Sequence, residues 1–70
     1  MNADTIRQWR NRHPFEPFEL RLSNGEHHQV QQAEAVAIGK NRIVIADHES
    51  DRIVHVALLH VSSLAALQGA

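Results

Sequence analysis

Residues 18–30, FELRLSNGEHHQV, decide the fold of this chain. Apolar and polar side chains alternate through the first five of them, which is the period of a half-buried β-strand. The Ser-Asn-Gly that follows is the clearest turn signal in the sequence. A two-residue Asn-Gly loop would place Phe18 opposite the polar Gln31. A three-residue loop with a left-handed Gly25 instead places Phe18 opposite Val30 and keeps one face of the hairpin apolar, so we predict the three-residue loop.

Further strand-like segments follow this hairpin at spacings of about 8 to 12 residues, a pattern typical of small β-barrels. Residues 31–34 fit either a helical turn or a loop. The predicted strands are 35–38, 43–46, 52–57 and 61–67, separated by a compact turn at 39–42, a polar loop at 47–51 and a tight turn at 58–60.

The residues before the hairpin predict a helix within residues 1–13. Asn2 or Asp4 can cap its start, and Ile6 and Trp9 lie three positions apart on one face. The following proline ends the helix, because the residue before a proline is pushed out of the helical region. The apolar stripe is narrow, which indicates a helix that covers part of a sheet.

Together these segments predict a mainly β fold in a single domain, residues 1–70. An N-terminal helix within 1–13 precedes a five- to six-stranded antiparallel small barrel over 15–67, and 68–70 form a frayed tail. Pro14 and Pro17 suit an extended start at the edge of a sheet.

Composition narrows the function classes. The chain has 70 residues, no cysteine and a net charge of −1. It therefore has no disulfide framework and no thiolate metal cage, and a reducing cytoplasm is the expected location. No apolar run is long enough to span a membrane, and no signal peptide is expected. Three arginines against one aspartate make residues 1–12 net +2, and residues 47–52 are net −2.

The strands at 43–46 and 53–58 carry apolar residues on both faces, whereas an isolated antiparallel barrel needs only an apolar inner face. A chain this small also builds a core of marginal size. We therefore predict a homo-oligomer whose interface includes Val44, Val54 and Val56 or their opposite-face neighbours. The alternative is that valine and isoleucine favour strands and tolerate exposure.

Two segments resemble the Sm-like proteins. The segment FELRLSNGE at 18–26 resembles their first hairpin, and VALLHVSSL at 56–64 resembles their closing strand, tight turn and last strand. With the leading helix, the order is similar to Sm-like or SH3-like small barrels. It also resembles short bacterial proteins of unassigned function that combine a Pro-Phe-x-Pro-Phe segment (14–18) with a closing Leu-Leu-His-Val (58–61).

The resemblance implies assembly through strand addition between barrels and, in the best-known members, binding of single-stranded RNA. This chain departs from the RNA-binding pattern, because residues 30–38 contain neither an aromatic to stack a base nor an Asp-Asn pair. RNA binding is therefore the alternative function. Its candidate contacts are the basic residues Arg7, Arg10, Arg12, Lys40 and Arg42.

Histidine is unusually frequent, with His13, His27, His28, His48, His55 and His60. Neighbouring histidines point to opposite faces of a strand, so no local pair chelates a metal, although convergence across strands stays open. For His55 the ordinary expectation is a hydrogen-bonded core residue. Histidines at an interface would instead make assembly sensitive to pH between about 5 and 7.

Catalytic motifs are not recognised. Asp47, His48 and Ser50 are neighbours in the sequence, and His60 lies beside two serines, but proximity of this kind is not a triad. We therefore predict a non-catalytic, homo-oligomeric binding or assembly module with no metal or cofactor and no membrane partner.

Overall fold

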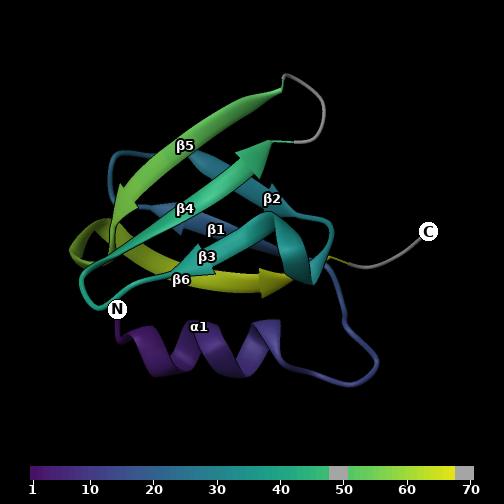
Figure 1. Cartoon of the computed structure of the whole chain (residues 1–70). Helices are drawn as coiled ribbons and strands as arrows, with labels where there is room; N and C mark the ends of the chain where they lie inside the picture. Colours follow the sequence, from purple (N-terminus) through teal and green to yellow (C-terminus); the bar gives the residue numbers. More distant parts are fainter. Residues whose placement is uncertain (48–50, 68–70) are drawn as a thin grey trace.

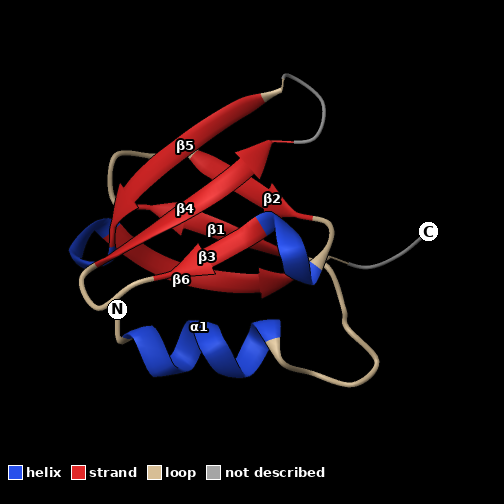
Figure 2. Ribbon diagram, viewed as in Figure 1, coloured by secondary structure: helices blue, strands red, loops and turns tan. Residues whose placement is uncertain are grey.

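One short helix and six strands make up the fold, and the computed structural model describes residues 1–47 and 51–67 (Figure 1, Figure 2). These elements confirm the mainly β class with an N-terminal helix. The elements are α1 (Ala3–Arg10), β1 (Phe18–Leu22), β2 (His27–Val30), η1 (Ala33–Ala35), β3 (Val36–Ile38), β4 (Arg42–Asp47), β5 (Arg52–Ala57), η2 (Leu58–His60) and β6 (Val61–Ala66), where η marks a 3-10 turn.

The strands form two antiparallel sheets of three strands each, in the orders β2-β1-β6 and β3-β4-β5. Strand β5 is an edge strand of the second sheet. No strand pairing joins the two sheets within residues 1–47 and 51–67, so closure into a barrel stays a prediction. Neither helix nor 3-10 turn of the described chain has the length and apolar character needed to cross a membrane.

The β1–β2 hairpin has the predicted three-residue loop. Phe18 pairs with Val30 and Leu20 with His28, and Gly25 adopts a φ of 92°. The loop is closed at both ends, because Leu22 donates its amide to Glu26 O at 2.8 Å and accepts from the amide of Gly25 at 3.0 Å. The register therefore follows from the left-handed glycine.

Replacing Gly25 by alanine should destabilise the protein by about 1 kcal/mol or more, because an L side chain is strained at positive φ. No heavy atom lies within 4 Å of the place where a Cβ would stand, so the loss would come from the backbone alone. Gly25→Asn should lose less, since asparagine tolerates positive φ better. Urea unfolding measures both, and an alanine variant as stable as the wild type would contradict this account of the hairpin.

The two sheets and α1 enclose a single apolar cluster. The helix contributes Ile6, which is fully buried, and Trp9 packs edge-on against Phe18 with ring centroids 5.6 Å apart. Phe15, from the segment before β1, lies 6.1 Å from Phe18. The buried apolar residues are Ile6, Phe18, Leu20, Leu22, Val30, Val36, Ile43, Ile45, Val56, Leu58 and Val61.

The helix lies within the predicted residues 1–13, and it begins after the first of the two candidate caps. Asn2 is the cap, because its Oδ1 accepts the amide of Asp4 at 2.7 Å. The last helical residue is Arg10, and the amide of Asn11 closes the final turn on Arg7 O. The guanidinium of Arg10 also donates to the backbone oxygen of Ala33 at 3.1 Å, which attaches the helix to η1.

The remaining boundaries agree with the sequence patterns where the structure describes them. The ambiguous segment at 31–34 contains the start of the 3-10 turn η1, and Leu58–His60 forms the tight turn η2. Ser62 interrupts the register between β1 and β6, and its hydroxyl donates to Arg21 O at 3.0 Å. The middle of the predicted 47–51 loop and the predicted frayed tail at 68–70 lie outside the described residues.

Glu19, on the outer face of β1, has a lowered pKa. The main cause is the hydrogen bond that Arg21 donates to Glu19 Oε1 at 2.9 Å; desolvation opposes the shift, and the nearby charges of His27 and Arg21 reinforce it. A pKa lower in the folded than in the unfolded state stabilises the fold above the unfolded value, and the contribution is lost as pH falls through the folded value. We expect Arg21→Gln to raise the pKa of Glu19, as followed by carboxyl carbon chemical shifts. An unchanged value would show that this hydrogen bond is not its cause.

Candidate interaction surface

Antiparallel pairing divides the apolar residues of β4 and β5 between two faces. Ile43 pairs with Val56 and Ile45 with Val54, and these side chains face the core. Val44 lies between Ile43 and Ile45 in β4, so its side chain points to the opposite, outer face, where it pairs with His55.

Two of the three valines named for the interface face the core within one chain, which leaves Val44 and the opposite-face neighbours that the prediction also allowed. Val56 is 5% exposed and belongs to the core, and Val54 is half-buried against it. Only Val44 lies on the outer face, where it is half-buried. The period of two is responsible, because residues 54 and 56 share the side of β5 that packs on the core while residues 53 and 55 share the other.

Ile53 is a large apolar side chain on the outer face that is 67% exposed, and it pairs with Ala46. With Ala37 and Val44 these residues form a patch without charged side chains, which we call the outer-face patch (Ala37, Val44, Ala46, Ile53). Ile53 belongs to the edge strand β5. The sequence reasoning included it only as an opposite-face neighbour of the valines, because the phase of β5 relative to the core was not known.

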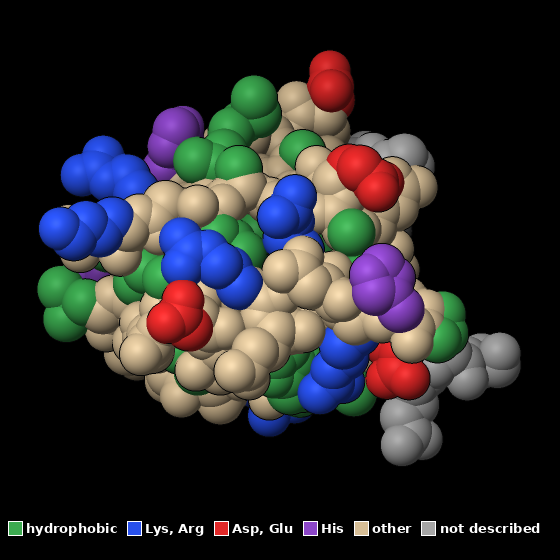
Figure 3. All heavy atoms as spheres, turned by 60° about the horizontal axis from the view of Figure 1, so that its bottom comes forward, with side chains coloured by type: hydrophobic (Ala, Val, Ile, Leu, Met, Phe, Trp, Pro, Cys, Tyr) green, Lys and Arg blue, Asp and Glu red, His purple; other side chains and the backbone are tan. Residues whose placement is uncertain are grey.

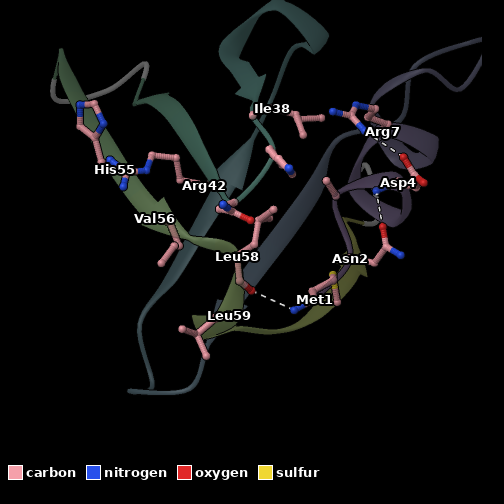
Figure 4. A pocket seen from close by; sticks show the side chains of 15 residues that line it. Met1, Asn2, Asp4, Arg7, Ile38, Arg42, His55, Val56, Leu58 and Leu59 are labelled. Atoms are coloured by element: carbon pink, nitrogen blue, oxygen red, sulfur yellow. Dashed lines mark hydrogen bonds and ion pairs between the residues drawn. The ribbon is translucent and has the colours of Figure 1, made fainter.

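A cationic groove lies where the start of α1, the β3–β4 turn and the end of β5 meet (Figure 4). Arg7, Lys40 and Arg42 line it, and its one carboxylate, Asp4, pairs with Arg7 at 2.8 Å. Leu59, on the rim, is 80% exposed. Figure 3 shows basic side chains spread over the face that carries α1, with some of them at one edge.

The five basic residues proposed for RNA contact therefore separate into two groups. Three line the cationic groove, but Arg10 and Arg12 do not. Arg10 is bonded to the backbone of η1, and Arg12 lies 4.2 Å over the ring of Trp9 with Glu16 Oε2 at 3.6 Å. These contacts hold the helix and the segment after it.

An acidic groove lies at the opposite end of β4 and β5. Glu34, from η1, lines it together with Asp47 at the end of β4 and Asp51 just before β5. No lysine or arginine lines it among the described residues. Two histidines of β2, His27 and His28, also line this groove.

The histidines that the structure describes do not gather into a metal centre. Within residues 1–47 and 51–67, no three His, Cys, Asp or Glu side chains are arranged to hold a metal ion. His28, His55 and His60 line a third groove beside β5. His28 Nε2 is buried without a hydrogen-bond partner, since Glu26 Oε2 at 3.7 Å is beyond hydrogen-bond distance.

The expectation for one histidine is wrong. His55 is exposed on the outer face and is not a core residue, because it pairs with Val44. His60 is exposed, while the neighbouring Ser62 hydroxyl is bonded to Arg21 O. His48 and Ser50 lie outside the described residues, so the predicted Asp-His-Ser grouping is not described.

Comparisons with models of known families, with curated proteins and with solved structures found no match to this chain.

Proposed function

We propose that the protein is a non-catalytic, homo-oligomeric assembly module of the Sm-like or SH3-like small-barrel type, working in the cytoplasm. The observation that carries this proposal is Ile53, a large apolar side chain 67% exposed on an edge strand. Edge strands present unpaired backbone groups that another strand can use, and natural edges are usually protected by charge. Here Arg52 is an exposed charged residue at the start of the edge strand, and the outer-face patch beside it carries no charged side chain.

A second copy is the partner that fits these features. Burying an exposed isoleucine stabilises an interface by about 1.5–3 kcal/mol, and a two-copy interface gains this on each copy. A single core of this size gives only a few kcal/mol of net folding stability. The free energy gained on association would therefore be a substantial fraction of the stability of one chain. The absence of cysteine agrees with the cytoplasmic location proposed.

Hydrogen exchange tests where copies meet. Amides of β5 that point away from β4 should exchange more slowly as the protein concentration is raised, since strand addition would bond them. Amides of β2, one of the two edge strands of the other sheet, serve as the internal comparison. Equal behaviour of β5 and β2 at all concentrations would argue against association through β5.

RNA binding is the second candidate, because Arg7, Lys40 and Arg42 line one groove. Labelled poly-U and poly-A, titrated at low and moderate salt, should then bind in a salt-dependent way that replacing these three residues with alanine removes. Arg12→Ala is the matched control, because Arg12 lies outside the groove. No binding even at low salt would exclude this function.

A further inference from the structure

We propose that the cationic groove binds an extended acidic peptide segment of a partner protein, one in which aspartate or glutamate side chains lie beside a large aliphatic side chain. The inference goes beyond the proposed self-association and does not depend on it, because all the residues that form the groove belong to a single chain.

Two of the three basic side chains of the groove are free to meet an anion. Among the described residues, Asp4 is the one carboxylate that lines the groove, and it pairs with Arg7 at 2.8 Å. Lys40 and Arg42 are exposed, and neither side chain forms an ion pair or hydrogen bond within residues 1–47 and 51–67. A groove with this excess of positive charge is complementary to an acidic partner.

The cations lie on opposite sides of the groove, which favours an elongated occupant. Figure 4 shows Arg7 on the side of α1 and Arg42 on the side of β5, with Leu58 between them. An extended peptide places side chains on the same side of its backbone at intervals of about 7 Å. It can therefore present carboxylates to both sides of the groove, whereas a single small anion would neutralise one side.

Apolar surface accompanies the charges. Leu59 on the rim is 80% exposed, and Ile38 adds a half-buried aliphatic side chain to the lining. An aliphatic side chain of the peptide would cover Leu59 while the neighbouring carboxylates meet the cations. A desolvated apolar contact with polar residues around it is the usual anatomy of a protein interface.

The composition of the groove favours a peptide over nucleic acid. No phenylalanine, tryptophan or tyrosine is among the described residues that line it, and single-stranded nucleic acid usually requires aromatic surfaces on which bases stack. An exposed leucine on the rim contributes nothing to a contact with phosphate groups, but it suits an aliphatic side chain of a peptide.

Fluorescence anisotropy of labelled peptides tests the inference. The probe is a short peptide of alternating aspartate and leucine, and its matched control has asparagine in place of each aspartate. At low salt the acidic peptide should bind the wild-type protein more tightly than the control peptide does, and added salt should weaken it. Replacing both Lys40 and Arg42 with alanine should weaken the acidic peptide about tenfold, since one exposed ion pair contributes a factor of about three.

Two further variants separate the parts of the groove. Leu59→Ala should also weaken the acidic peptide about tenfold, because it removes much of the apolar contact. Arg52→Ala is the matched control, since it removes an exposed arginine from the other end of β5, outside the groove, and it should bind as the wild type does. Thermal unfolding checks that each variant folds, and Arg42→Gln replaces Arg42→Ala if the double variant does not.

Three results would overturn the inference. The first is an acidic peptide that does not bind at low salt or binds no more tightly than its asparagine control. The second is a folded double variant that binds the acidic peptide as tightly as the wild type. The third is poly-U that displaces the peptide and binds equally well to Leu59→Ala, which would assign the groove to nucleic acid. None of them bears on self-association, which light scattering measures separately.

Discussion

Phe18→Ala is expected to destabilise the protein by about 3–5 kcal/mol, the usual loss when a buried phenylalanine is truncated. Phe18 is fully buried at the start of β1, and the rings of Trp9 and Phe15 pack against it. It therefore joins the helix, the segment before β1 and the central strand of one sheet. A core this small rarely supplies more than about 3–5 kcal/mol, so the variant should be largely unfolded at room temperature.

The matched control is Phe18→Leu, which keeps most of the apolar volume. It should cost clearly less than the alanine variant and retain a cooperative urea transition. Circular dichroism and tryptophan fluorescence follow both, since Trp9 is the only tryptophan and contacts Phe18 directly. A folded alanine variant with the urea midpoint of the wild type would show that this aromatic cluster is not the centre of the core.

Ile53→Asp is expected to have the largest effect on assembly. The substitution places a carboxylate in the middle of an apolar contact, where burying an unpaired charge is strongly unfavourable. Because Ile53 is mostly exposed within one chain, the fold itself should change little in stability. We therefore expect a folded protein with the mass of a single chain, 7.9 kDa, by light scattering.

Gln29→Asp is the control for this experiment. Gln29 is an exposed residue of β2, an edge strand of the other sheet, so the variant adds the same charge to a comparable strand position. It should keep the mass of the wild type. If both variants, or neither, lost the higher mass, the outer-face patch would not be the surface through which copies associate.

Local chemistry made much of the fold predictable from sequence. The Ser-Asn-Gly turn and the alternation around it gave the register of β1 with β2, because only a left-handed Gly25 keeps Phe18 opposite Val30. Leu-Leu-His predicted the turn η2, since it breaks the alternation where the chain passes between the sheets. These features depend on a few neighbouring residues.

The candidate site was less predictable, because it depends on contacts between distant segments. An apolar run such as IVIA or IVHVA does not reveal which of its two faces meets the core, so Val56 could be assigned to an interface although it is buried. Arg7 lines the same groove as Lys40 and Arg42, although it is more than thirty positions away from them in the sequence. Likewise, the hydrogen bond that the Arg10 guanidinium donates to the backbone oxygen of Ala33 depends on where η1 lies.

The central claim is that this chain assembles with copies of itself. Its most direct test is the mass of the wild-type protein by light scattering over a wide range of concentration at low salt. The account predicts a mass that is a multiple of 7.9 kDa and that falls as the protein is diluted. A mass of a single chain at every concentration would contradict it.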